Sequence, residues 1–169
     1  MTGVPIVVMG AAGCGKSTVG AILAARQRAT FLDADSLHPP ENVAKMAAGT
    51  PLTDDDRRPW LDHVGARIAE AVNAGLDIVV ACSALRRPYR DAIRRTAGAS
   101  VTFVHLHADV ATLASRIAAR SDHFMPAALL HSQLSTLEPL QGDEAGFAID
   151  VSPPPSLVAS QIARRLFLT

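Results

Sequence analysis

The sequence predicts an α/β fold, a parallel sheet of about five strands with helices on both faces. Two observations lead to this prediction. Apolar runs of four to six residues, the pattern of strands buried on both faces, alternate with longer stretches whose apolar residues recur at helical spacing. The alternation continues along the whole chain, which favours parallel strands joined by helical crossovers. With 169 residues, of which 49% are hydrophobic, the chain suits one domain with one substantial core.

The first two expected elements flank a glycine-rich turn. Val4–Met9 is a continuous apolar run that ends at Gly10, so we expect a buried strand there. Ser17–Gln27 follows the turn, and its apolar Val19 and Leu23 have the spacing of one helix face. A strand, a tight turn and a helix are therefore expected in direct succession.

Proline, glycine and capping residues mark the next elements. Ala29–Leu32 is expected to form a second short strand, and two prolines open a short helix, Glu41–Ala48, that a glycine ends. Thr53 and the aspartates after it are typical of a helix N-terminus, which predicts a longer helix over Arg57–Ala74. Ile78–Cys82 has the pattern of another buried strand.

The rest of the chain continues the alternation. Two more apolar runs predict the strands Val101–Leu106 and Phe147–Val151. Four stretches with helical spacing predict the helices Arg87–Arg95, Val110–Ala119, Ala127–Leu137 and Ser156–Leu166. Ser121–Pro126 interrupts the helical pattern between the second and the third of these.

A phosphate-binding motif occupies the turn after the first strand. It fits the pattern G-x-x-x-x-G-K-[ST] and consists of Gly10, Ala11, Ala12, Gly13, Cys14, Gly15, Lys16 and Ser17. Glycines bring backbone N–H groups close to phosphate oxygens, and the start of the next helix adds unpaired donors. Lys16 can reach the β- and γ-phosphates, and the Ser17 hydroxyl can ligate Mg²⁺. The alternative is a turn that only joins a strand to a helix. Because pattern and context agree, we expect an ATP site, which extends to Thr18.

Two aspartates follow the second predicted strand. In an extended strand Asp33 and Asp35 would point to the same side, at the carboxyl end of the sheet where ligands bind in such folds. We expect Asp33 to hold Mg²⁺ through water and Asp35 to orient a substrate hydroxyl and take its proton. Capping or turn chemistry is the alternative explanation of the pair.

The motif alone does not separate kinases from GTPases or other ATPases. A guanine-recognition motif of the N-K-x-D kind is absent, and the chain is short. Both points favour a compact kinase that acts on a small molecule.

Together with the phosphate loop, further segments resemble the gluconate kinases over nearly the whole chain. They are Phe31–Pro39, Asn42, Lys45–Met46, Gly49–Arg57, Pro59–Trp60, Ala81–Arg87, Tyr89–Asp91, His123–Met125, Gln133 and Leu137–Leu140. The resemblance implies a nucleoside-monophosphate-kinase-like P-loop fold, with a mobile lid inserted at roughly 120–127 into one domain over 1–169. It also implies transfer of the γ-phosphoryl group of Mg²⁺-bound ATP to the 6-hydroxyl of D-gluconate, commonly by a homodimer.

The substrate that the resemblance implies points to further residues. Gluconate carries a carboxylate, which a planar guanidinium binds bidentately, so Arg57, Arg86 and Arg90 are candidates for substrate binding. His38 is a candidate hydrogen-bond partner for a substrate hydroxyl. A solvated surface charge is the alternative role for any one of these arginines.

The predicted lid supplies the last candidates. Arg116 and Arg120 are spaced i, i+4, so they share one helix face and are expected to contact ATP. Arg120 is the stronger candidate because it lies nearer the break in the helical pattern. With Lys16 and Asp35 it completes the expected catalytic set.

Charge and composition exclude other classes. Lysine plus arginine number 16, as do aspartate plus glutamate, which gives no electrostatic case for nucleic-acid or membrane-surface binding. Two cysteines are too few for a disulfide framework. We therefore expect a cytoplasmic protein without nucleic-acid or membrane partners. Two other functions stay open: a shikimate-kinase-type or nucleoside-monophosphate-kinase-type enzyme, and an ATP-binding regulatory module without turnover.

Overall fold

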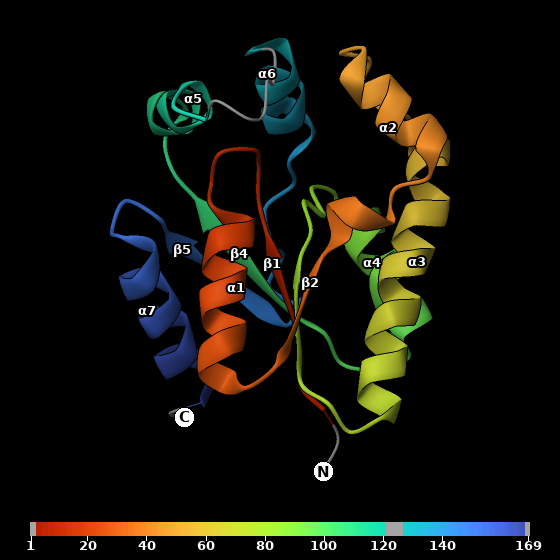
Figure 1. The fold of residues 1–169 in the computed structure, drawn as a ribbon, viewed down its shortest axis with the longest axis vertical. Helices are drawn as coiled ribbons and strands as arrows, with labels where there is room; N and C mark the ends of the chain where they lie inside the picture. Colours follow the sequence, from red (N-terminus) through yellow and green to blue (C-terminus); the bar gives the residue numbers. More distant parts are fainter. Residues whose placement is uncertain (1–2, 121–126, 168–169) are drawn as a thin grey trace.

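The computed structural model describes residues 3–120 and 127–167, which form helical layers on both faces of a central sheet (Figure 1). The sheet has five strands in the order β2-β3-β1-β4-β5, and every neighbouring pair is parallel. The strands are β1 (Pro5–Met9), β2 (Thr30–Asp33), β3 (Ile78–Ala81), β4 (Thr102–His107) and β5 (Gly146–Asp150). The predicted fold class is confirmed.

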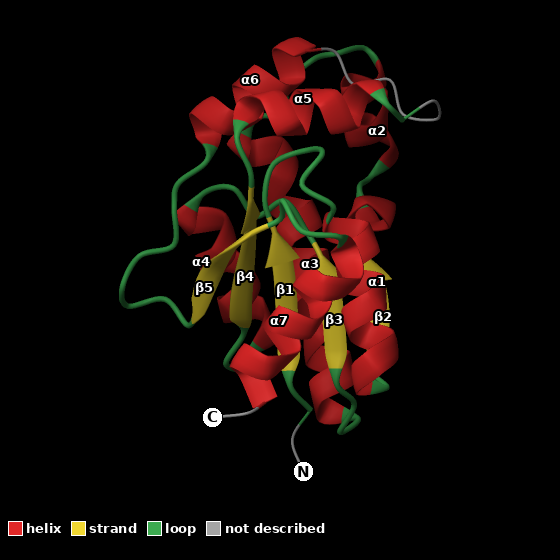
Figure 2. Ribbon diagram, turned by 90° about the vertical axis from the view of Figure 1, so that its left-hand side faces the viewer, coloured by secondary structure: helices red, strands yellow, loops and turns green. Residues whose placement is uncertain are grey.

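The helices cover both faces of the sheet and its carboxyl edge. They are α1 (Lys16–Gln27), α2 (Pro40–Ala47), α3 (Asp54–Asn73), α4 (Arg87–Ala97), α5 (Val110–Ala118), α6 (Ala127–Thr136) and α7 (Pro155–Phe167), with the 3₁₀ helix η1 (Ala34–Leu37). Helices α1 and α7 lie on one face, and α3 and α4 on the other (Figure 1). Helices α2, α5 and α6 lie above the carboxyl ends of the strands (Figures 1 and 2).

Two hydrophobic clusters hold these layers together. Val7 and Met9 of β1 belong to the cluster under α3 and α4, whereas Ile6 and Val8 belong to the cluster under α1 and α7. Side chains of a strand alternate between the two faces of a sheet, and both faces of β1 are covered. This explains why the strand appears in the sequence as an unbroken apolar run.

The carboxyl end of β1 is the natural ligand site of this topology. Strand β1 lies at the centre of the sheet, with β3 on one side and β4 on the other. The chain therefore leaves β1 at a point where the strand order reverses, and open α/β sheets bind ligands at such points. The predicted phosphate loop starts there.

Most predicted boundaries agree with the structure within a few residues, and three expectations need comment. Residues 34–37 form η1, so Asp35 lies in a 3₁₀ helix; the expectation that it continues the strand with Asp33 is wrong. Helix α3 begins at Asp54, three residues before the predicted start, because Thr53 and Asp56 form a capping box. The expected lid falls mostly on residues 121–126, outside the described part of the chain.

Candidate active site

The phosphate loop joins β1 to α1 in a conformation that requires glycine. Gly13 and Gly15 have φ angles of 82° and 89°, which L side chains rarely adopt. A Cβ on Gly13 would lie 2.8 Å from the carbonyl oxygen of Leu113 in α5. Helix α1 starts at Lys16, so its N-terminal N–H groups face the loop. The Nζ atom of Lys16 donates a hydrogen bond to the carbonyl oxygen of Ala11 at 3.2 Å.

Ser17 and Asp33 meet beside this loop. The Ser17 hydroxyl donates to Oδ2 of Asp33 at 2.6 Å, and Oδ1 of Asp33 accepts the N–H of Asp35 at 3.0 Å. Oxygen donors of this kind suit Mg²⁺, which keeps several waters and phosphate oxygens in its shell. No group of three or more His, Cys, Asp or Glu side chains within the described residues could hold a metal by itself. The pair therefore fits a Mg²⁺ ion that is bound mainly through water and nucleotide.

Charged residues surround the carboxyl end of β3. Cys82 follows this strand and is buried. Burial, and then the negative charge of Asp35, raises the pKa of the Cys82 thiol to about 12, while Lys16 acts in the opposite direction. These influences place Asp35 and Lys16 close to the same strand end. The cysteine itself stays a neutral thiol at physiological pH.

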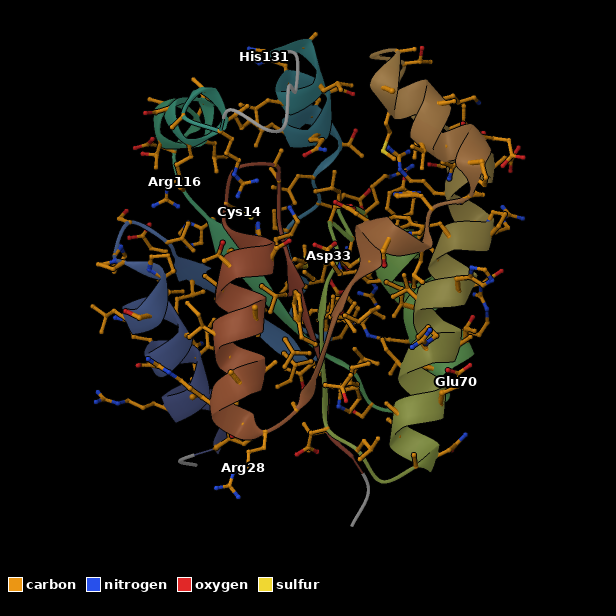
Figure 3. All side chains as sticks on the ribbon, viewed as in Figure 1. Cys14, Arg28, Asp33, Glu70, Arg116 and His131 are labelled. Carbon is orange, nitrogen blue, oxygen red and sulfur yellow. The ribbon has the colours of Figure 1, made fainter. Side chains whose placement is uncertain are left out.

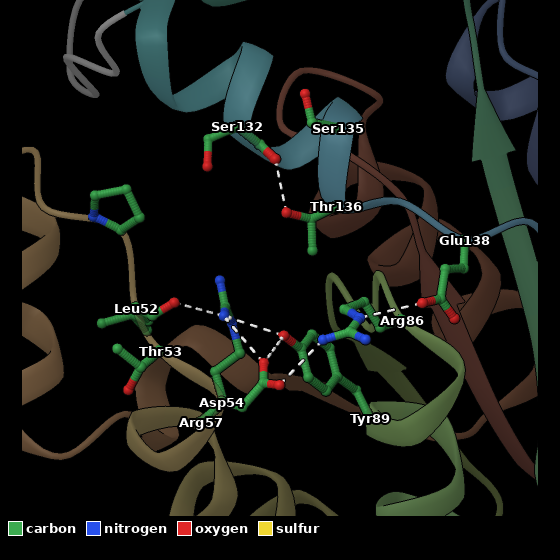
Figure 4. Close-up of a pocket in the computed structure, with 11 residues that line it drawn as sticks. Leu52, Thr53, Asp54, Arg57, Arg86, Tyr89, Ser132, Ser135, Thr136 and Glu138 are labelled. Carbon is green, nitrogen blue, oxygen red and sulfur yellow. Dashed lines mark hydrogen bonds and ion pairs between the residues drawn. The ribbon is translucent and has the colours of Figure 1, made fainter.

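A pocket of about 540 Å³ opens beside these groups (Figure 4). It lies between the N-terminal ends of α3 and α4 and the helix α6. Its lining is mostly polar and consists of Pro51, Leu52, Thr53, Asp54, Arg57, Arg86, Tyr89, Ser132, Ser135, Thr136 and Glu138. Such a set of hydroxyl, carboxylate and guanidinium groups suits a small polyhydroxylated anion.

Two arginines in this pocket differ in their partners. Arg86 donates Nε to Glu138 at 3.1 Å and Nη1 to Asp54 at 3.0 Å, so two carboxylates neutralise it. Arg57 donates Nη1 to uncharged acceptors, the carbonyl oxygen of Leu52 at 2.6 Å and the hydroxyl of Tyr89 at 3.1 Å. The distance from Nη1 of Arg57 to Oδ1 of Asp54 is 4.0 Å. Figure 4 shows the Arg57 guanidinium between Leu52 and Tyr89, extending toward α6.

His38 lies close to Arg57 but has a largely structural environment. Its ring stacks on Trp60 with the ring centroids 4.1 Å apart, and Nδ1 is 3.2 Å from Nδ2 of Asn42. Burial, and then the charge of Arg57, lowers the pKa of His38 to about 4. His38 is therefore neutral at pH 7. Trp60 is buried and donates Nε1 to the carbonyl oxygen of Ala34 at 2.7 Å, so it packs in the core rather than in the pocket.

Comparisons with known proteins identify the family of this chain. A family model described as an AAA domain matches residues 6–140. The gluconokinase of Gluconobacter oxydans is 44% identical over 159 residues, which cover 94% of this chain and 89% of that protein. The chain belongs to the gluconokinase family.

Two solved structures support the same membership. A gluconokinase from Sinorhizobium meliloti is 42% identical with a TM-score of 0.82, and the alignment covers 98% of this chain and 96% of that one. A sugar kinase from Janibacter is 41% identical with a TM-score of 0.90, covering 95% and 92% of the two chains. Within the described residues of this family member, no helix is long and apolar enough to cross a membrane.

Arg90, expected to bind substrate, has a different place in this gluconokinase-family fold. It is fully buried, and its guanidinium forms a bidentate pair with Glu144, at 2.7 Å from Nε and 2.9 Å from Nη2. Nη1 donates to the carbonyl oxygens of Ala84, Leu85 and Glu138. Arg90 does not line the pocket. Its role is to hold α4 to residues 138–144, which corrects the sequence prediction.

The two lid arginines flank the nucleotide side of the site. Arg116 lies in α5 and donates Nη2 to the carbonyl oxygen of Val151 at 2.6 Å, near the end of β5 (Figure 3). Arg120 is exposed and follows α5, which ends at Ala118, so it does not share a helix face with Arg116 as expected. Thr18 lies in the exposed first turn of α1. The contacts of these three residues with ATP stay predictions.

Sequence reasoning assigned no role to two residues that connect the elements of the site, Tyr89 in the pocket and Gln133 beside the phosphate loop. Tyr89 donates to Asp54 at 2.5 Å and accepts from Arg57, so it links α3 to α4. Gln133 of α6 accepts the backbone N–H of Ala12 at 2.7 Å. Both residues lie in segments that resemble the gluconate kinases, but single-sequence patterns assign no role to an isolated Tyr or Gln.

Proposed function

We propose that this chain transfers the γ-phosphoryl group of ATP to the 6-hydroxyl of D-gluconate, giving 6-phospho-D-gluconate and ADP. The observation that carries this proposal is a polar, hydroxyl-lined pocket in which Arg57 donates to uncharged acceptors, lined by the same helix α6 that contacts a complete phosphate loop, in a chain of the gluconokinase family. The pocket supplies a cation for a carboxylate and several hydrogen-bonding groups for hydroxyls. Gluconate carries both kinds of group.

The nucleotide side of the proposed site is built on the loop Gly10–Ser17. Backbone N–H groups of the loop and of the α1 N-terminus bind the phosphates, and Lys16 releases the carbonyl oxygen of Ala11 to reach the β- and γ-phosphates. Arg116 contacts the nucleotide from α5, and Arg120 contacts it from the residues that follow this helix. Ser17 would hold Mg²⁺ directly and Asp33 would hold it through water. The ion would supply positive charge that offsets the negative charge of the β- and γ-phosphates.

Arg57 is the proposed anchor of the gluconate carboxylate. In the ligand-free protein its hydrogen-bond acceptors are uncharged groups of Leu52 and Tyr89. Exchanging these acceptors for the gluconate carboxylate would form a charge-assisted bidentate pair. Arg86 would have to give up Glu138 or Asp54 to do the same, so we assign it to shaping the pocket and orienting Asp54. His38, held neutral beside Arg57, is suited to donate to or accept from a sugar hydroxyl.

The chemical step needs no covalent enzyme intermediate. We assign Asp35 to accept the proton of the 6-hydroxyl while its oxygen forms the new bond to the γ-phosphorus. The bond between that phosphorus and the β,γ-bridging oxygen breaks, and ADP leaves. Lys16 and Arg120 offset the negative charge on the transferring group. Their positive charges matter most when water is excluded, because the local dielectric is then low.

A panel of acceptors tests this function against its alternatives. ADP release is measured with gluconate, with neutral glucose and sorbitol, with shikimate, and with nucleoside monophosphates. The proposal predicts rapid ADP release with gluconate and slow release with all other acceptors. Efficient turnover of shikimate or a nucleotide would favour the other kinase classes, and binding of ATP without any acceptor-dependent release would favour a regulatory module.

We also propose, from family membership, that the protein is a single-domain enzyme that acts as a homodimer in the cytoplasm. Light scattering on purified protein at micromolar concentration measures the mass, and a monomer would contradict the dimer. Cell fractionation measures the location.

A further inference from the structure

Helix α6 contacts both the phosphate loop and the pocket. On one face, Leu130 and Leu134 pack in the cluster that contains Ala11 and Cys14 of the loop. Leu130 is only 3% exposed, so this face of the helix belongs to the core. The helix is therefore part of the support under the nucleotide site.

The opposite face of the same helix lines the pocket. Ser132, Ser135 and Thr136 are all pocket residues (Figure 4). They are related by i, i+3, i+4 spacing, as are positions 130, 133 and 134. With about 3.6 residues per turn, the centres of these two sets fall on roughly opposite sides of the helix. A shift of α6 caused by a ligand in the pocket therefore also moves the residues of α6 that contact the phosphate loop.

Gln133 joins the loop-facing side to the loop backbone. Its Oε1 atom accepts the N–H of Ala12 at 2.7 Å, across 121 positions of sequence. Backbone N–H groups of a phosphate loop are its phosphate ligands, so this bond fixes the orientation of a phosphate-binding segment. The C-terminal end of α6 is fixed as well, because the N–H of Glu138 donates to the carbonyl oxygen of Leu85 at 2.7 Å.

We propose that Gln133 is a positioning residue that couples the pocket to the phosphate loop, so that gluconate and ATP each strengthen the binding of the other. The inference rests on the proposed function. An acceptor held against the hydroxyl face of α6 restricts the helix, and Gln133 transmits this restriction to Ala12. The second ligand then meets a loop that is already ordered and loses less conformational entropy on binding. By linkage the effect on the two affinities is the same.

The test compares Gln133→Met with the parent protein. Methionine keeps the length of the side chain but removes the oxygen that accepts the Ala12 N–H. Calorimetry measures the affinity for a non-hydrolysable ATP analogue with and without saturating gluconate. We expect gluconate to tighten analogue binding in the parent by roughly fivefold or more, the usual lower range of such couplings, and by less than about twofold in Gln133→Met.

Two further variants separate coupling from a general structural effect. His131→Ala changes an exposed residue of the same helix and is expected to keep the parent's ratio of affinities. Gln133→Glu keeps an acceptor for Ala12 but adds negative charge near the phosphates, so it should retain coupling while weakening the analogue's binding. The ratio compares the affinity for the ATP analogue with and without gluconate. A ratio near one in the parent, or the same ratio in the parent and in Gln133→Met, would overturn the proposal.

A readout without gluconate distinguishes failure of this inference from failure of the function. In the ligand-free protein, hydrogen exchange of the Ala12 amide should be faster in Gln133→Met than in the parent, because its acceptor is lost. Unchanged exchange overturns the inference whatever the substrate is. In another outcome, the parent protein fails to bind gluconate, while Ala12 exchange is still faster in Gln133→Met than in the parent. This result would refute the proposed function but support the hydrogen bond between Gln133 and Ala12.

Discussion

The buried pair of Arg90 and Glu144 allows a sharp prediction about stability. Glu144→Gln keeps the size of the side chain but removes the charge that faces Arg90. Arg90 is 0% exposed, as is the side chain of Glu144, so water cannot replace the lost partner. The remaining acceptors of Arg90 are backbone carbonyl oxygens, which carry no net charge.

The magnitude follows from the burial of both groups. Breaking a buried ion pair by neutralising one partner costs roughly 3–5 kcal/mol, because the other charge is left uncompensated. For a chain of this length each kcal/mol corresponds to about 2–4 °C, so the melting temperature should fall by roughly 6–20 °C. Urea unfolding, followed by circular dichroism, measures the change in the free energy of unfolding directly.

A control and a double-mutant cycle make the prediction specific. Asp143 is the neighbouring acidic residue, but its side chain is 68% exposed, so Asp143→Asn should change stability far less. In an Arg90→Met background, Glu144→Gln should cost less than in the parent, because the fully buried charge that it strands is already gone and Arg94, which still pairs with the carboxylate, is partly exposed. A loss of less than about 1 kcal/mol for Glu144→Gln alone would refute the assignment of a buried structural pair.

The other predictions concern catalysis, substrate binding and acid stability. Lys16→Ala should abolish turnover with an unchanged circular dichroism spectrum, and near-normal activity would exclude the phosphate-loop mechanism. Asp35→Asn should lower kcat strongly with little change in the KM for ATP, whereas a loss confined to ATP affinity would make Asp35 a nucleotide or metal residue. Arg57→Ala should raise the KM for gluconate about tenfold to hundredfold and spare ATP binding, while Arg58→Ala, its exposed neighbour, should match the parent in both. Burial alone would raise the pKa of Glu144, but its hydrogen bonds outweigh this and lower the pKa to about 2 from the ordinary 4.5. The pair's stabilisation should therefore be complete above pH 4.5 and be lost as the pH falls toward 2, and Glu144→Gln should flatten that part of the urea-stability profile.

Local sequence signals were sufficient for the scaffold and for the phosphate loop. Unbroken apolar runs located the strands, and glycines with positive φ marked the turn after β1. The contact between Ser17 and Asp33 follows from the fold, because β1 and β2 both end at the carboxyl edge of the sheet. The parallel topology thus brings the phosphate loop and Asp33, which are far apart in the sequence, into one site.

Pairings between distant segments were beyond the reach of the sequence. Arg90 has the appearance of a ligand-binding arginine until Glu144, 54 positions away, is brought against it. Asp54 was expected only to cap a helix, yet it also binds Arg86 and Tyr89 at the pocket floor. Asp35 lies in η1 directly after β2, so the strand alternation used to place it does not apply there, and its catalytic role stays a prediction.

The most direct test of the central claim follows the transferred phosphorus itself. The parent protein is incubated with Mg-ATP and D-gluconate, and ³¹P and ¹³C NMR spectra are recorded as the reaction proceeds. The account predicts equal amounts of ADP and of a phosphomonoester attached to C6 of gluconate, and neither product with Lys16→Ala. Release of inorganic phosphate with unmodified gluconate, or a phosphate on another carbon, would contradict it.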